Sequence, residues 1–70
     1  MNIIYTLHAE EQIKERKLIK LWVEEAIQWP DTTQHVGNKY HIIKKIDGKI
    51  LKVVYVKEKH IKVITTYFIK

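Results

Sequence analysis

The segment HAEEQIKER begins with His8 and ends with Arg16, two side-chain types that can do chemistry on phosphate groups. Imidazole is well matched to moving protons near neutral pH, and a guanidinium binds phosphate through two parallel hydrogen bonds. On a helix these residues lie about 12 Å apart, so they cannot pair directly but could contact two parts of one extended ligand. The spacing indicates a histidine acid or base together with an arginine phosphate clamp.

A structural interpretation of the same segment stays open. On a helical wheel Arg16 falls within about 60° of Ala9 and Ile13, so it continues an apolar stripe. A guanidinium at the margin of a core needs a carboxylate or a phosphate to offset its desolvation. In this interpretation Arg16 pairs with Glu24 or Glu25 on a second helix, and the histidine bonds to the chain near the helix start.

Hydrophobic spacing predicts the elements that position these residues. NIIY is typical of a short strand, and Thr6 is the predicted N-cap of a helix over residues 7–16. A second amphipathic helix follows in LIKLWVEEAIQW and ends at Pro30. Strands are predicted in KYHIIKKI, KILKVVYV and IKVITTYFI. We therefore expect one α+β domain over residues 1–70, with the order β-α-α-β-β-β and two helices packed on one face of a small antiparallel sheet.

The Asp47-Gly48 pair predicts a type I′ hairpin, because both central positions of that turn need positive φ. This turn places His41 opposite Val54 and also sets Ile46 opposite Lys49 and Ile43 opposite Lys52.

A turn around residues 58–59 would then place Val54 opposite Val63 and Lys52 opposite Thr65. With a period of two, one face becomes the floor for the helices. It collects Tyr40, Ile42, Lys44, Leu51, Val53, Tyr55, Ile64, Thr66 and Phe68. The second face mixes aliphatic residues, Val63 among them, with His41, Lys45, Lys52, Thr65 and Tyr67.

The positive charge belongs to the second half of the chain. Residues 1–31 hold four Lys/Arg against six Asp/Glu, net −2, and residues 32–70 hold nine lysines against two acidic residues, net +7. Such a one-sided field favours a polyanion or an acidic protein segment as partner. Lysines on exposed strands also discourage aggregation, so the structural explanation of this charge stays open.

The composition argues against several other classes of protein. The chain has no cysteine, and its histidines at positions 8, 35, 41 and 60 lack the spacing of a zinc site, so no metal and no cofactor are predicted. The first residues show neither a basic leader nor an apolar run long enough for a membrane span. We expect a cytoplasmic protein without membrane contact.

The order and spacing of motifs over nearly the whole chain resemble a small prokaryotic family catalogued as domain of unknown function 4258. The resemblance rests on HAEEQIKERKLIKLWVEEAIQWPD, followed by GKILKVVYV and IKVITTYF. Relatives usually have glycine after the arginine and Ser or Thr at the start of the second helix, where this chain has Lys17 and Ile19. The bend is therefore expected to lack a left-handed residue and a cap. The matching positions are His8, Ala9, Arg16, Val23, Pro30, Thr66 and Tyr67.

The resemblance implies a RelE-like fold, because that family looks like a branch of the RelE/ParE/BrnT-type toxin superfamily. Several members of the superfamily cut RNA without a metal, and many are neutralised by an antitoxin. It therefore implies a toxin-like, metal-independent RNA endonuclease, with an acidic antitoxin as partner and RNA or the ribosome as target. Whether the chain also forms a homo-oligomer is left open.

Cleavage of RNA by its own 2′-oxygen removes a proton and builds negative charge on phosphorus. In this hypothesis His8 or His41 moves the proton, Arg16 stabilises the phosphate charge, and Tyr67 positions or protonates the substrate. The residues assigned to RNA binding are Lys45, Lys52 and Thr65.

The alternative function is a non-catalytic basic module that binds an acidic protein segment or nucleic acid through the same lysines. Tyr40, Tyr55 and Phe68 could stack on bases, but aromatic residues on a predicted helix-covered face more often belong to the core.

Overall fold

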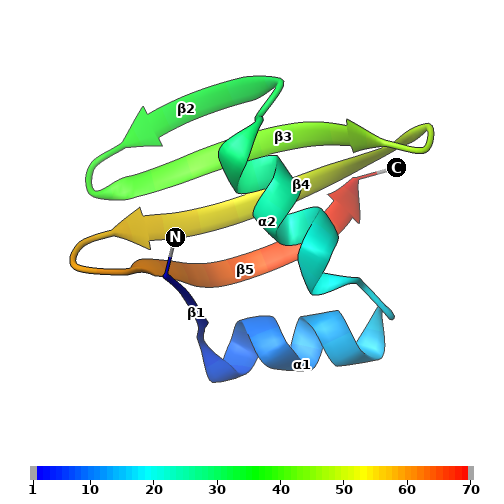
Figure 1. The fold of residues 1–70 in the computed structure, drawn as a ribbon, viewed down its shortest axis with the longest axis horizontal. Coiled ribbons are helices and arrows are strands. Elements are labelled where there is room, and N and C mark those ends of the chain that lie inside the picture. Colours follow the sequence, from blue (N-terminus) through cyan, green and yellow to red (C-terminus); the bar gives the residue numbers. More distant parts are fainter. Residues whose placement is uncertain (1, 70) are drawn as a thin grey trace.

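The computed structural model describes residues 2–69, which form two helices and one five-stranded sheet. In chain order the elements are β1 (Ile3–Tyr5), α1 (Leu7–Glu15), α2 (Lys20–Gln28), β2 (Thr32–Val36), β3 (Lys39–Ile46), β4 (Lys49–Lys57) and β5 (Ile61–Ile69). Helix α2 crosses one face of the sheet, whereas helix α1 runs beside β5 at the sheet margin (Figure 1). The α+β class predicted from the sequence is confirmed.

Strand β2 was not predicted from the sequence. It pairs antiparallel with β3 through a turn at Gly37 and Asn38, where Gly37 has φ +61°. A glycine at the first central position of a two-residue turn is a hairpin signal. TTQHV itself has too little alternation of apolar residues to indicate a strand. All five residues of β2 are exposed, as expected for an edge strand.

The sheet is mixed, so the prediction of a purely antiparallel sheet was wrong. Its strand order is β1-β5-β4-β3-β2, and β1 runs parallel to β5. The helices carry the chain from β1 to β2 at the opposite edge, and three successive hairpins bring it back beside β1 (Figure 1). Because the strand direction reverses at each of the three hairpins, β5 runs opposite to β2 and parallel to β1.

The hairpin between β3 and β4 has the predicted register. Asp47 and Gly48 both have positive φ, +50° and +79°, as a type I′ turn requires. His41 lies opposite Val54, and the remaining predicted pairs, Ile43 with Lys52 and Ile46 with Lys49, are also present.

The register predicted for the hairpin between β4 and β5 was wrong. Residues 58–60 form the loop, and an irregularity between Val54 and Tyr55 shifts the pairing by one further residue. Val54 therefore lies opposite Thr65, and Val63 lies opposite Tyr55. The consequence is that Val63, predicted on the second face, is fully buried in the core under the helices. A β-bulge of this kind changes which side chains share a face.

The bend between the helices contains the left-handed residue that we expected it to lack. Lys17 has φ +53°. The amide of Leu18 donates to the carbonyl of Ile13 at 2.9 Å, and the amide of Lys17 donates to that of Lys14 at 3.4 Å. This is a Schellman motif, in which Leu18 and Ile13 are both buried. The other part of the prediction is confirmed, because the N-cap of α2, Ile19, makes no side-chain capping bond.

The core lies between α2 and the sheet. Val23, Ala26 and Ile27 of α2 pack against Ile42, Leu51 and Val53 of the central strands. Helix α1 contributes its buried residues to the same cluster from the margin. The predicted core role of the aromatic residues on this face is confirmed for Tyr55, which is buried, and Tyr40 and Phe68 pack against the same cluster.

Candidate functional site

The face of the sheet turned away from α2 carries the candidate site and is called here the open face. Directly paired residues of neighbouring strands point to the same face. The pairing places most of the predicted second face there, and it excludes Ile61 and Val63, which lie on the core side. The residues that β3, β4 and β5 place on the open face are Lys39, His41, Ile43, Lys45, Ile50, Lys52, Val54, Val56, Lys62, Thr65, Tyr67 and Ile69.

Lys52 and Tyr67 are direct cross-strand neighbours on the open face. Side chains in such a pair start from Cβ atoms roughly 5 Å apart, and both residues are half-buried. His41 is a diagonal neighbour of Lys52, because Lys52 pairs with Ile43, two residues along β3. The diagonal separation is roughly 7–8 Å. Lys52 therefore stands between a phenol and an imidazole on one surface.

Lys45 lies farther along β3, opposite Ile50, near the end of the open face. Its side chain is exposed, and its backbone amide donates to a carboxylate oxygen of Asp31 at 2.8 Å. The same carboxylate lies 3.7 Å from the ammonium of Lys44. The ammonium of Lys45 makes no ion pair within residues 2–69, so it remains free to meet an anion.

Thr65 is held by α1. Its hydroxyl donates to the side-chain carbonyl of Gln12, and that carbonyl also accepts from the backbone amide of Thr66 at 3.1 Å. β1 pairs with β5 only up to Val63, so Gln12 takes over as hydrogen-bond partner along the edge of β5. If Thr65 binds RNA as predicted, its hydroxyl must serve both the RNA and this structural contact with Gln12.

Arg16 lies at the margin of the open face, beyond the last residue of α1. Helix α1 and strand β5 run in the same direction (Figure 1). Arg16 is one helical turn past Gln12, about 6 Å of rise, and Tyr67 is two residues past Thr65, about 6.6 Å. Arg16 is thus roughly level with Tyr67 along the edge of β5. Its side chain is exposed, and within residues 2–69 it pairs with neither Glu24 nor Glu25, so the structural interpretation of Arg16 was wrong.

His8 lies in the first turn of α1, one turn before Gln12 and at the opposite end from Arg16. Its side chain is exposed, and no hydrogen bond to it is formed within residues 2–69. The N-cap role belongs to Thr6, as predicted: its hydroxyl accepts from the amide of Ala9 at 3.1 Å and donates to the carbonyl of Ile64. Of the two predicted proton carriers, His41 stands nearer to the Lys52–Tyr67 pair.

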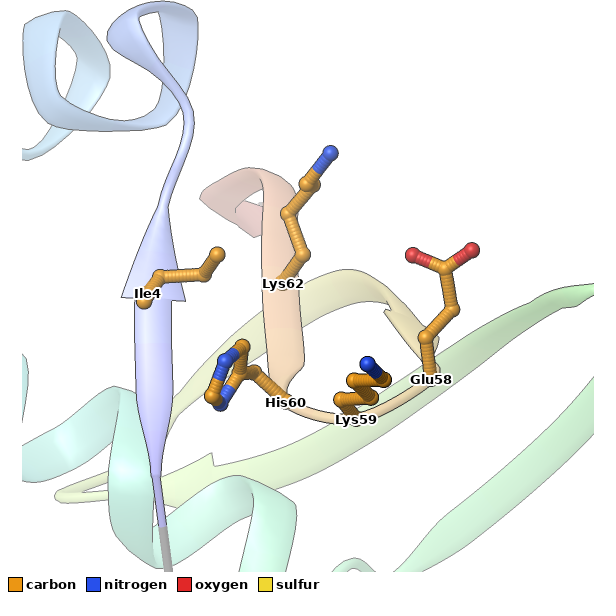
Figure 2. Close-up of a pocket in the computed structure, with 5 residues that line it drawn as sticks. All are labelled: Ile4, Glu58, Lys59, His60 and Lys62. Carbon is orange, nitrogen blue, oxygen red and sulfur yellow. The ribbon is translucent and has the colours of Figure 1, made fainter.

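A feature that the sequence analysis missed lies at the far end of the sheet, around the β4–β5 turn. Ile4, Glu58, Lys59, His60 and Lys62 line an open pocket there (Figure 2). The signal available in the sequence is the polar run KEKH, which by itself indicates only a turn.

Within residues 2–69, no three His, Asp or Glu side chains come close enough together to hold a metal ion. No helix of this part of the chain is long and apolar enough to cross a membrane.

The sequence profile of a family described as a domain of unknown function, DUF4258, matches residues 5–68. No curated protein and no solved structure matches the chain significantly. The matched segment includes both helices and nearly all of β5, so it covers every residue of the candidate site.

Proposed function

The chain belongs to the family described as domain of unknown function DUF4258, and from the geometry of its open face we propose that it binds RNA there and cleaves it without a metal, as a toxin-like protein. One observation carries this proposal: Lys52 is flanked on the same face by Tyr67 and by His41. A cation between two groups able to transfer protons is the arrangement that cleavage of a phosphodiester needs.

The arrangement assigns a role to each side chain. His41 accepts the proton of the ribose 2′-hydroxyl as the 2′-oxygen attacks phosphorus. Lys52 and Arg16 stabilise the negative charge on the phosphate oxygens. Tyr67 gives its proton to the departing 5′-oxygen, so the products are a 2′,3′-cyclic phosphate and a free 5′-hydroxyl. His41 then passes its proton through water to the deprotonated Tyr67, and both groups return to their starting state.

An acidic antitoxin segment is the partner that fits the same surface. Residues 32–70 carry a net charge of +7, and four of their nine lysines lie on the open face. A segment rich in Asp and Glu would compete with RNA for these cations, because both present arrays of negative charge. Inhibition of RNA binding would then be the direct result of antitoxin docking.

A cleavage assay in EDTA with purified protein tests the catalytic assignment. We expect His41→Ala and Tyr67→Phe each to lower the cleavage rate by roughly 10²–10⁴-fold, the usual contribution of general acid–base catalysis. His8→Ala is the matched control, since His8 is exposed and lies away from Lys52. Loss of cleavage in His8→Ala with full activity in His41→Ala would reject this assignment of roles.

A non-catalytic nucleic-acid module is the second candidate, because His41 is only a diagonal neighbour of Lys52 and is not in direct contact with Tyr67. Salt titration of RNA binding separates the candidates. Replacing both Lys45 and Lys52 by alanine should reduce the magnitude of the logarithmic salt slope by about 1.4, or about 0.7 for each phosphate contact on single strands. Lys14→Ala with Lys57→Ala, which removes the same charge outside the open face, should leave the slope unchanged. Binding that follows this pattern without any cleavage establishes the module, and an unchanged slope rejects RNA binding by the open face.

A further inference from the structure

The pocket at the β4–β5 turn has the size of a small-ligand site. Its volume is about 500 Å³, within the range of roughly 300–1,000 Å³ typical of ligand pockets. Strand β1 forms one wall through Ile4, and the turn and the start of β5 form the other through Lys59, His60 and Lys62 (Figure 2).

The lining combines an apolar surface with positive charge. The side chain of Ile4 reaches from β1 toward β5, and the ring of His60 lies beside it (Figure 2). Ile4 is 44% exposed, a large value for an isoleucine in a strand. The ammonium groups of Lys59 and Lys62 make no ion pair within residues 2–69. The carboxylate of Glu58 lies on the side away from Ile4 (Figure 2).

The pocket is continuous with the open face. Ile4 pairs with Lys62, and Lys62 lies in the row of Val56 and Lys39 across the sheet. Along β5, Lys62 precedes Tyr67 by five residues, one of them taken up by the bulge. The distance between the pocket and the Lys52–Tyr67 pair is therefore on the order of 15 Å.

We propose that this pocket is a nucleotide subsite, in which a nucleobase lies against Ile4 and the ring of His60 while its phosphate contacts Lys59 and Lys62. The subsite rests on the proposed function, because it would bind another nucleotide, farther along the RNA strand held at Lys52. Imidazole rings are among the surfaces on which single-stranded bases stack, and lysines bind phosphate as point charges.

The chemistry of the lining favours a nucleotide over simpler anions. A bare phosphate would use the two ammonium groups and leave the apolar surface of Ile4 in water. A nucleoside without phosphate would cover Ile4 and His60 but leave both cations unpaired. A nucleotide uses both parts of the pocket, so its affinity should exceed that of either fragment.

The separation between pocket and candidate catalytic centre sets a length requirement. At a stacked rise of 3.4 Å per nucleotide, 15 Å corresponds to about four to five nucleotide steps, and to fewer in an extended strand. A dinucleotide at Lys52 cannot reach the pocket, whereas a hexanucleotide can. Substitutions in the pocket should therefore affect long oligonucleotides and spare short ones.

Titration of the whole protein with adenosine monophosphate, followed by backbone amide NMR, tests the subsite without any cleavage. We expect the largest shift changes at Ile4, His60 and Lys62, with at least tenfold weaker binding for adenosine and for inorganic phosphate. We expect the affinity for the nucleotide to fall at least threefold in each of the variants Ile4→Ala, His60→Ala and Lys62→Ala. Lys14→Ala, on the exposed part of α1, should leave its affinity unchanged.

The outcomes separate this subsite from the proposed function. Equal affinity for the nucleotide and for phosphate, or shift changes confined to other residues, would overturn the subsite even where RNA is cleaved at Lys52. Pocket binding of the nucleotide with no RNA cleavage would retain the subsite and reject the catalytic role. Thermal unfolding of each variant checks that the fold is intact. The double variant I4A/H60A, which leaves every open-face residue of β3, β4 and β5 in place, must still bind a dinucleotide if the fold persists and the open face binds RNA.

Discussion

The contact between Gln12 and the edge of β5 gives a quantitative prediction about stability. One side-chain oxygen accepts from the backbone amide of Thr66 and from the hydroxyl of Thr65. Gln12→Met keeps most of the side-chain volume but removes the acceptor. The hydroxyl can rotate toward water, whereas the amide of Thr66, a fully buried residue, loses its partner. An unsatisfied buried donor costs about 1–3 kcal/mol, so we expect the free energy of unfolding to fall by about 2 kcal/mol.

Two measurements check this value. Thermal unfolding should show a Tm lower by roughly 8–16 °C, since 1 kcal/mol corresponds to about 4–8 °C in a domain of this size. Hydrogen exchange should show the amide of Thr66 exchanging roughly 30-fold faster, because about 1.4 kcal/mol corresponds to a factor of ten. Gln12→Glu is the matched control, since a carboxylate still accepts hydrogen bonds. Unchanged protection of Thr66 in Gln12→Met would refute the reasoning, whatever the change in Tm.

Two further predictions concern backbone strain and pH. Lys17→Gly should raise the free energy of unfolding by about 0.5–1 kcal/mol in urea denaturation, because glycine adopts the observed φ of +53° without the steric cost borne by lysine. A lower free energy of unfolding in this variant would show that the bend is not strained. As a control, Lys14→Gly, within α1, should destabilise the protein by about 1 kcal/mol. Burial, with smaller contributions from Glu24 and Glu10, raises the pKa of Tyr5 to about 12 from an ordinary value of 10.0. The unfolded chain therefore releases this proton first, so Tyr5 contributes stability below pH 10 that is lost as the pH rises toward 12. Tyr5→Phe should flatten the fall in stability between pH 10 and pH 12, and an equally steep fall in the variant would contradict this assignment.

The elements with strong local signals could be predicted from the sequence. Hydrophobic spacing located both helices, and the hydroxyl of Thr6 marked the start of α1. The Asp47-Gly48 turn set the register of β3 and β4, because few residues tolerate positive φ at two adjacent positions. This register alone brings His41 and Lys52 to one face, so part of the candidate site was available before the structure.

The errors lie where pairing depends on contacts between distant parts of the chain. The three-residue loop puts Val63 on the core side in place of Ile64. The bulge at Val54 and Tyr55 then returns Thr65 and Tyr67 to their predicted face and brings Tyr67 opposite Lys52. The charged sequence KEKH does not determine the length of the loop between β4 and β5. The local pattern is therefore compatible with either set of β5 residues facing the core. Burial of Val63 under the helices favours the observed one, and that is a tertiary effect.

The sequence by itself determined the α+β class, the helices, the strands β3, β4 and β5, and the positive charge of residues 32–70. Each of these follows from side-chain period, turn chemistry or composition within a short window. Only the tertiary structure decided that α1 lies along the edge of β5, that Gln12 completes the hydrogen bonding of that edge, and that Arg16 comes level with Tyr67. The physical reason is that the unpaired N–H and C=O groups of a strand edge form hydrogen bonds with the groups that the completed fold places beside them. No local stretch of sequence specifies those partners.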